Sequence, residues 1–374
     1  MNQTNIIPLV DLKAQYLGIK EEIDKAINDC IVEANFIKGK IVTEFENAFS
    51  QYIGTDYCVG CGNGTDALEL ILKSLNIGPG DEVIVPALTW IATAEAVNNV
   101  GAEPVFVDID LNNYTIDVSK IEEKVTKKTK AIIPVHLYGC PADMNQISRI
   151  GKKFRLFIVE DCAQAHGAEY FGKKVGTFGI ASAFSFFPSK NLGAFGDGGA
   201  IVTNNQELAN TVRKISNHGQ LQTRHAHSII GRNSRLDSIQ ASILNAKLRY
   251  LDRWNYNRSK ASKYYQSKLK GIETIILPSV MQNRTHVYHL FVVRSKRRKE
   301  LIEALSKNGI ASGIHYPTPL PFLEAYNYKQ HKPGDFPIAV KVSKEILSLP
   351  IYPEITDLQI DTICDTIFEV YKDK

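Results

Sequence analysis

The chain has 374 residues, of which 44% are hydrophobic and 22% are charged, as in ordinary globular proteins. This length corresponds to about two or three domains, and the composition excludes disordered and fibrous classes. Lysine and arginine number 44 and aspartate and glutamate 40, so the excess of positive charge is small and dispersed, and we expect no nucleic-acid partner.

The sequence contains no segment typical of secretion or membrane insertion. Residues 1–8 lack a basic region followed by an apolar one, and the longest apolar stretch, residues 83–97, is too short and too polar to span a bilayer. Cys58 and Cys61 form a lone CxxC pair without the further ligands of a structural zinc site. We therefore expect a cytoplasmic protein with no membrane association and no metal.

Short β-branched segments alternate with helical patterns through the first two thirds of the chain. Leu68, Ile71, Leu72 and Leu75 recur at helical spacing, and the glycines and proline of residues 78–80 end that helix. Such alternation favours an α/β fold with a mostly parallel sheet flanked by helices. The expected strands are residues 57–59, 82–85, 104–107, 131–135, 156–160, 181–186 and 200–203.

After about Asp237 the pattern changes. Residues 236–269 are typical of one long or kinked helix, rich in lysine, arginine and tyrosine. We expect a large α/β domain of residues 1–247 and a smaller C-terminal α+β domain of residues 248–374. The smaller domain should contain strands at 288–293 and 311–316, a helix at 300–307 and two helices at its end.

A glycine-rich turn at residues 61–68 joins an expected strand to an expected helix. Backbone N–H groups at a helix N-terminus bind phosphate, so Gly64 and Thr65 are candidates to cradle one, with the Thr65 hydroxyl as an added donor. Gly60 and Gly62 could open a dinucleotide-binding motif, but its third glycine would fall at Thr65. Taken alone, the segment favours an ordinary turn between a strand and a helix.

Asp161 follows an expected buried strand. In open α/β sheets ligands bind at the carboxyl ends of strands, where a carboxylate can pair with a cationic heterocycle. Gln164, one turn further, could hydrogen-bond a substituent of the same ring, whereas His166 has no evident partner. The alternative interpretation of Asp161 is a residue that caps a helix.

Lys190 stands between an aromatic strand and a turn rich in glycine. Phe186, Phe187 and Phe195 should bury its amine and lower the amine pKa, and a neutral lysine is what Schiff-base chemistry needs. A phosphate cradle, a carboxylate for a pyridinium nitrogen and a Schiff-base lysine together indicate a pyridoxal-phosphate enzyme. Trp90 is the candidate to stack on the ring, with a position in the core as the alternative.

The chain resembles the DegT–StrS family of sugar-nucleotide aminotransferases, which have the pyridoxal-phosphate-dependent transferase fold type I. The resemblance rests on residues 7–13, 64–68 and 231–241 and on the segments around Asp161 and Lys190. Relatives that dehydrate sugars have histidine in place of the lysine, so Lys190 favours transamination. The resemblance assigns the cofactor pyridoxal 5'-phosphate to Lys190 (covalent bond), Asp161 (pyridine nitrogen), Gln164 (ring hydroxyl), and Gly64, Thr65 and Ser185 (phosphate).

The resemblance also implies a partner and a substrate. Asn233 is similar to the residue that the family donates to the phosphate from the neighbouring subunit, which implies a homodimer with shared active sites. Residues 185–199 and 216–237 resemble the branch that aminates carbon 3 of 3-keto sugar nucleotides, in particular 3-keto derivatives of UDP-N-acetylglucosamine. L-glutamate would be the donor and 2-oxoglutarate its product, in surface-polysaccharide or lipopolysaccharide biosynthesis.

Three further residues are candidates for the sugar nucleotide. Arg235 could bind the diphosphate or a sugar carboxylate, because a guanidinium group matches those oxygens in pairs. His315 and Tyr316 resemble a loop that lines the sugar site. Enzymes that act on dTDP-3-keto-6-deoxyhexoses share almost all of these residues, and a 4-keto sugar-nucleotide aminotransferase is a further alternative. A non-catalytic cofactor-binding protein is disfavoured because the lysine and the ring carboxylate are both present.

Overall fold

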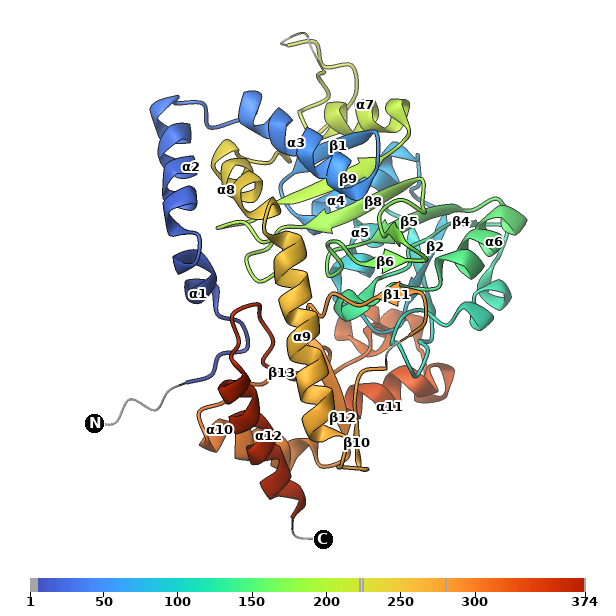
Figure 1. Cartoon of the computed structure of the whole chain (residues 1–374). Coiled ribbons are helices and arrows are strands. Elements are labelled where there is room, and N and C mark those ends of the chain that lie inside the picture. Colours follow the sequence, from blue (N-terminus) through green and yellow to red (C-terminus); the bar gives the residue numbers. More distant parts are fainter. Residues whose placement is uncertain (1–5, 222, 224, 280, 373–374) are drawn as a thin grey trace.

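The computed structural model describes residues 6–221, 223, 225–279 and 281–372, and a seven-stranded sheet forms its centre (Figure 1). The strand order is β1-β9-β8-β5-β4-β2-β3. All neighbours from β8 to β3 are parallel, whereas β9 is antiparallel to both β1 and β8. The predicted mostly parallel sheet is thus confirmed. Its strands are β1 (Tyr57–Cys61), β2 (Glu82–Pro86), β3 (Glu103–Val107), β4 (Thr129–Ile132), β5 (Phe157–Asp161), β8 (Ala181–Ser185) and β9 (Gly199–Thr203).

Helices cover both faces of this sheet, because successive residues of a strand point to opposite sides. On one face Val159, Ala183 and Ile201 pack in a core with helices α4, α5 and α7. On the other face Phe184 and Val202 pack with α3 and α8, and α6 covers the region of β4 and β5. These helices are α3 (Lys40–Ile53), α4 (Gly64–Ser74), α5 (Ala92–Asn99), α6 (Met144–Phe154), α7 (Gln206–Ile215) and α8 (Ser238–Leu248).

The turn from β1 into α4 lies where the sequence predicts a phosphate site. Asn63 caps α4, since its Oδ1 accepts a hydrogen bond of 2.8 Å from the N–H of Asp66. A Cβ atom at Gly199, the first residue of β9, would lie only 2.4 Å from the Asn63 carbonyl oxygen. Glycine is therefore required there, because it lets the backbone of β9 approach the start of α4.

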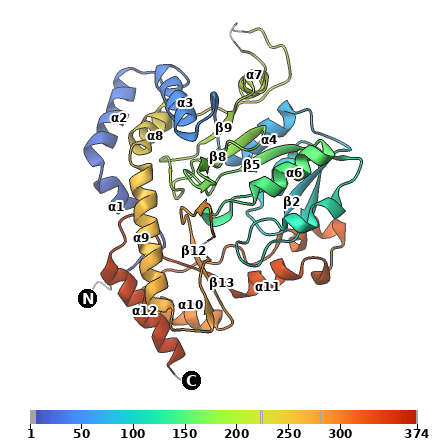
Figure 2. The ribbon, with the colours of Figure 1, turned by 45° about the vertical axis from the view of Figure 1, so that its right-hand side comes forward.

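A second, smaller sheet of order β10-β12-β13 packs with α10 and α12. The long helix α9 runs from the side of the large sheet to this smaller one (Figures 1 and 2). The helical region expected at residues 236–269 is two helices, α8 and α9. The other elements are α1 (Leu12–Leu17), α2 (Lys20–Val32), β6 (Glu169–Tyr170), β7 (Lys173–Lys174), α9 (Leu251–Leu269), β10 (Ile275–Ile276), β11 (Arg284–Thr285), β12 (Phe291–Ser295), α10 (Arg298–Lys307), α11 (Pro337–Glu345), β13 (Ile346–Leu349) and α12 (Asp357–Tyr371).

The prediction of a strand at residues 311–316 is wrong. Gly313 makes only an isolated bridge to Ser348, and the strand that pairs with β12 is β13, which the sequence analysis did not predict. All four residues of β13 are buried, so the segment has no polar alternation. A short, continuously buried run cannot be distinguished from a helical segment by periodicity.

A residue near the start of the chain packs in the core of the smaller sheet, and residues near the end of the chain pack in the core of the large sheet. Ile7 pairs with Ile310 and packs in the core of the smaller sheet. Phe336 and Ala339, late in the sequence, pack instead in the core of the large sheet. The domain boundary between residues 247 and 248 stays a prediction. In the described part of the chain, no helix has both the length and the apolar character that a membrane span requires.

Candidate active site

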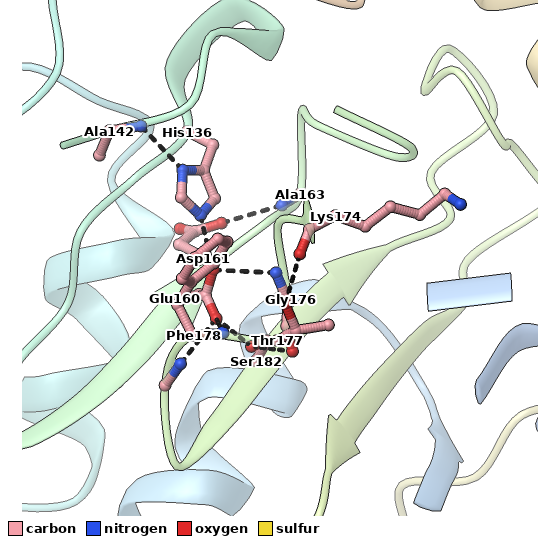
Figure 3. Close-up of polar contacts among 11 residues, drawn as sticks. His136, Ala142, Glu160, Asp161, Ala163, Lys174, Gly176, Thr177, Phe178 and Ser182 are labelled. Carbon is pink, nitrogen blue, oxygen red and sulfur yellow. Dashed lines mark hydrogen bonds and ion pairs between the residues drawn. The ribbon is translucent and has the colours of Figure 1, made fainter. Parts of the chain in front are cut away.

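Asp161 is the last residue of β5, and its side chain is buried at the carboxyl end of the large sheet (Figure 3). Its Oδ2 accepts a hydrogen bond of 2.8 Å from the Thr93 hydroxyl, and its Oδ1 accepts one of 3.1 Å from the N–H of Ala163. Burial raises the pKa of Asp161, and these two bonds and the charge of Lys190 oppose the rise. The carboxylate is thus oriented from two sides and buried next to a cation.

Glu160, the residue before Asp161, holds the end of β5 in place (Figure 3). Its carboxylate accepts hydrogen bonds from the N–H groups of Gly176, Phe178 and Gly179, from the Ser182 hydroxyl and from the His136 ring, at 2.8 to 3.1 Å. Burial disfavours ionisation of Glu160, but the donors outweigh it and its pKa is lowered. The backbone N–H of His136 also donates to the Asp161 carbonyl, at 3.1 Å, which fixes the strand end further.

His136, Glu160 and Cys162 lie within 4.8 Å of one another, at a spacing that a metal ion could use. Hydrogen bonds already occupy His136 and Glu160. His136 Nδ1 accepts from the N–H of Ala142 at 3.0 Å, so the ring proton is on Nε2 and points to Glu160. Neither ring nitrogen therefore has a free lone pair for a metal.

Lys190 lies in the turn between β8 and β9. Burial lowers the pKa of its amine to about 8, although the charge of Asp161 acts in the opposite direction. Among the described residues, none forms a hydrogen bond with Nζ. Phe186 is buried as expected, but Phe187 and Phe195 are 52% and 43% exposed, so the prediction that they bury the amine is wrong. The alternation of side chains between the two faces of the sheet ends at Ser185, the last residue of β8. Beyond this residue, the direction of a side chain no longer follows from its position in a strand.

Three neutral histidines lie in the electrostatic surroundings of Lys190. Burial lowers the pKa of His166 to about 3, and it also lowers the pKa of His289 and His315. The positive charge of Lys190 adds to each effect. Within the described residues, both ring nitrogens of His166 are buried without a hydrogen bond of ordinary geometry. These three rings therefore add no positive charge near the Lys190 amine.

The N-terminus of α4 meets the end of β8. A Cβ atom at Gly64 would lie 2.7 Å from the Ser185 Cβ, so only glycine allows this approach. The Ser185 Oγ accepts a hydrogen bond of 3.3 Å from the N–H of Phe187, and the side chains of Ser185 and Thr65 are only partly buried. The structure thus brings Gly64, Thr65 and Ser185 together around one helix N-terminus.

Gln164 links the loop after Asp161 to a segment far along the chain. Its Oε1 accepts from the N–H of Tyr138 at 2.7 Å, and its Nε2 donates to the Tyr316 hydroxyl at 3.0 Å. The rings of Trp90 and Tyr316 have centroids 5.6 Å apart. Trp90 is 58% exposed, so the alternative that it is a core residue is wrong. The Tyr138 hydroxyl donates to the carbonyl of His315, which joins that residue to the same group.

Asn233 and Arg235 form no hydrogen bond or ion pair, in the described part of the chain, with the residues grouped around Lys190. Arg235 instead lines a cavity of about 190 Å³ together with Lys38 and Arg213, and its Nη1 donates to the side chain of Asn217 at 3.4 Å. Asn233 is exposed. The sequence therefore grouped these two residues with a site that they do not reach within one chain.

Sequence reasoning missed several residues of the site, namely Thr93, His136, Tyr138 and Glu160. His136 and Tyr138 follow β4, which pairs with β5, so the same carboxyl-end argument that selected Asp161 could have found them. The role of Glu160 had no such signal, because three of its five donors come from a loop at residues 176–179.

The chain matches the DegT/DnrJ/EryC1/StrS aminotransferase family over residues 18–368. It belongs to this family. The aminotransferase is 45% identical, over 98% of both chains, to a UDP-N-acetyl-3-dehydro-alpha-D-glucosamine 3-aminotransferase of Acidithiobacillus ferrooxidans. It is also 45% identical, over 97% of this chain and 99% of the relative, to a dTDP-3-amino-3,6-dideoxy-alpha-D-galactopyranose transaminase of Aneurinibacillus thermoaerophilus.

Solved structures match equally well. The structure of DesV from S. venezuelae in complex with a ketimine intermediate superposes with a TM-score of 0.96 at 42% identity and covers 99% of both chains. The predicted family, transferase fold, aminotransferase activity and pyridoxal 5'-phosphate cofactor are confirmed. The aminotransferase acts on sugar nucleotides, as the family does.

Proposed function

We propose that this aminotransferase transfers an amino group from L-glutamate to carbon 3 of a 3-keto sugar nucleotide in the cytoplasm. The substrate is UDP-linked and carries a 2-acetamido group, and the product enters surface-polysaccharide or lipopolysaccharide biosynthesis. One observation carries the chemistry. A lysine whose pKa is lowered to about 8 lies in the turn after β8 and interacts with a buried carboxylate at the end of the adjacent strand β5.

The described residues fit pyridoxal 5'-phosphate, which supplies an electron-withdrawing ring when bound. Asp161 holds a proton at the pyridine nitrogen, because its buried carboxylate is already aimed by two donors. Lys190 would hold the cofactor covalently, and its amine, whose pKa burial lowers to about 8, would move a proton at the reacting carbon.

The phosphate binds at the start of α4. Gly64 allows the close approach to Ser185, and the hydroxyls of Ser185 and Thr65 add donors to the backbone N–H groups and the helix dipole. Gln164 uses one N–H on Tyr316, which leaves its second N–H for the ring hydroxyl. Trp90 stacks on the ring, supported by its exposure and by its contact with Tyr316.

The active sites are shared between the subunits of a homodimer. The side chains on either side of Asn233 face their own chain, since Arg232 pairs with Asp66 at 2.8 Å and the Ser234 hydroxyl donates to Asp66 at 2.6 Å. Asn233 is exposed between them, and we propose that it binds the phosphate of the partner's cofactor. Arg235, two residues on, is proposed to contact the diphosphate or a carboxylate of the sugar nucleotide.

Subunit exchange tests the shared site. Lys190→Ala and Asn233→Asp homodimers should both be inactive. Random mixing makes half of the dimers mixed, and each mixed dimer holds one intact site, so about a quarter of wild-type activity should return. If exchange is demonstrated by mass spectrometry and activity does not return, Asn233 acts within its own chain.

Two observations support the substrate. The relative from A. ferrooxidans is named for amination at carbon 3 of a 3-dehydro UDP-N-acetylglucosamine, and it matches this chain over nearly its full length. His315 and Tyr316 lie beside Gln164 and Trp90, where a loop can hold the sugar carbonyl against the cofactor amine. The equally similar dTDP-sugar relative keeps a dTDP-3-keto-6-deoxyhexose as the second candidate.

The reverse reaction avoids the unstable keto sugar. Incubation of a UDP-linked 2-acetamido-3-amino sugar with 2-oxoglutarate should form glutamate and consume the amino sugar. Consumption of a 4-amino sugar nucleotide, without the 3-amino isomer, would overturn the position of amination. Equal turnover of a dTDP-3-amino-6-deoxyhexose would support amination at carbon 3 but would contradict the proposed preference for a UDP-linked 2-acetamido sugar.

A further inference from the structure

The turn that carries Lys190 is held through the residue next to it. Asn191 is 1% exposed, and its Nδ2 donates to the Asn255 Oδ1 at 2.8 Å and to the Val287 carbonyl at 2.9 Å. The turn itself has no helix or strand from residue 186 to residue 198. Side-chain contacts therefore contribute strongly to the position of the Lys190 backbone.

Asn255 also binds the loop that follows Asp161. Its Nδ2 donates to the carbonyl oxygen of His166 at 2.8 Å. The next residue, Gly167, has a φ of +80°, and a Cβ atom there would lie 2.9 Å from the Asn255 Nδ2 and 2.3 Å from the Tyr52 hydroxyl. This loop thus packs directly on the Asn255 side chain.

We propose that Asn255 is a positioning residue that fixes the Lys190 turn and the Asp161 loop relative to each other. Its amide has an oxygen that accepts and a nitrogen that donates, and it uses the oxygen on the Lys190 side and the nitrogen on the Asp161 side. The proposal rests on the roles proposed above for Lys190 and Asp161. It adds a residue that acts through its contacts with Asn191 and His166.

Helix α9 is a suitable base for this contact. Figures 1 and 2 show it running from the large sheet to the smaller one. One turn after Asn255, the buried guanidinium of Arg258 donates to the carbonyls of Tyr288 and Ile351, at 3.2 and 2.9 Å. Arg258 thereby attaches α9 to residues of the smaller domain, and Asn255 attaches the same helix to two loops of the large sheet. These two sets of contacts together fix the position of Asn255. Small errors in the placement of reacting groups cost large factors in rate.

The test uses Asn255→Ala and Asn255→Asp in the cofactor-loaded enzyme, with Asn257→Ala as the matched control. Asn257 lies on the same helix, and its amide donates to the Pro353 carbonyl at 3.3 Å, away from both loops. Asn255→Ala should lower kcat about 10- to 100-fold, with KM for the sugar nucleotide changed less than about threefold. Asn255→Asp should fall in between, because it keeps the acceptor and loses the donor.

A second readout does not depend on turnover. In the apoprotein, the pH midpoint for chemical labelling of Lys190, followed by mass spectrometry, should rise above that of the wild type in Asn255→Ala. A loosened turn exposes the amine to water, so its pKa moves back toward the ordinary lysine value. Asn257→Ala should keep the wild-type midpoint. Asn191→Ala should reproduce the Asn255→Ala effects, and the double variant should add little, since both single variants remove the hydrogen bond between Asn191 and Asn255.

The outcomes separate the two proposals. If borohydride reduction fixes the cofactor to a lysine other than Lys190, the proposed function is wrong in its central residue. If the cofactor is on Lys190 but Asn255→Ala and Asn191→Ala keep the wild-type kcat and labelling midpoint, the positioning role of Asn255 is overturned. A loss of activity that saturating cofactor restores would overturn it too, because that result indicates weaker cofactor retention only. Should Asn255→Ala not fold, Asn255→Asp and Asn191→Ala decide the question.

Discussion

Lys190 and Lys247 are two lysines in which burial lowers the amine pKa to about 8, yet their surroundings differ. Lys247, on α8, is 1% exposed, donates to the Gly193 carbonyl at 2.7 Å and lies 4.6 Å from the centre of the Phe195 ring. Lys190 is only partly buried, and no hydrogen bond to its Nζ occurs among the described residues. Lys190 lies within the turn that follows β8, whereas Lys247 lies on α8 and donates a hydrogen bond to the backbone of that turn.

The difference shows that a lowered pKa does not by itself identify a reactive lysine. Burial makes the neutral amine available near pH 8 in both cases. Lys247 uses its amine to hold the backbone of the turn, where a substrate cannot reach it. Lys190 keeps its amine unbound and beside Asp161, so only this lysine combines a neutral form, access and a neighbouring carboxylate.

The largest effect should come from Lys190→Ala, which removes the nucleophile. We expect activity to fall by several orders of magnitude while pyridoxal 5'-phosphate still binds non-covalently through the start of α4. Borohydride reduction of the wild type, followed by peptide mapping, should place the cofactor on Lys190. Recovery of the label on Lys247 would show that Lys247, and not Lys190, is the reactive lysine.

Asp161→Asn should have the next largest effect. An amide cannot keep the pyridine nitrogen protonated, and a hydrogen bond to a charged group contributes about 1.5–3 kcal/mol, or roughly one to two decades in rate. The measurement is kcat under saturating substrates, with circular dichroism to show that the variant folds. A kcat within twofold of the wild type would place the partner of the ring elsewhere.

The pH dependence of labelling should separate the two amines. Only the neutral form of an amine reacts, and this form increases as the pH rises through the pKa. Lys190 of the apoprotein should therefore gain reactivity toward acetic anhydride around pH 8 and level off above it, well below the usual lysine range. Lys247 has a similar pKa but should stay unlabelled while the protein is folded. Equal labelling of both would show that access does not distinguish them.

Lys247→Met should have the smallest effect on catalysis. It leaves the Gly193 carbonyl without its donor, which costs about 1–2 kcal/mol of unfolding free energy, whereas Lys247→Gln retains a donor. A lysine pKa that is lower in the folded state makes the unfolded chain bind more protons between pH 8 and 10.5, so wild-type stability rises with pH there. Urea titrations should show this rise reduced in Lys247→Met. An unchanged pH dependence would mean that folding does not lower the pKa of Lys247.

The sequence determined much of this protein by itself, because the relevant signals are local. The seven strands of the large sheet are all present near their predicted positions, since each is a short segment bounded by turn residues and most are rich in β-branched residues. Asp161 was selected because it follows an expected strand, and the carboxyl-end rule for parallel sheets needs no three-dimensional information. Lys190 was selected from the aromatic and glycine-rich residues that surround it in the sequence. The helix after Gly64 followed from its apolar spacing and its glycine-rich start.

Only the tertiary structure decided what holds these residues in place. Asn255 lies 64 residues from Asn191 and 89 from His166, and no periodicity connects positions so far apart. The same holds for Gln164 and Tyr316, which are 152 residues apart. Phe187 was predicted to be buried and faces outward, because the direction of a side chain beyond the end of a strand depends on how the turn folds back. Strands and helices follow from neighbouring residues, whereas the orientation of a catalytic group follows from contacts that form only after the layers have packed.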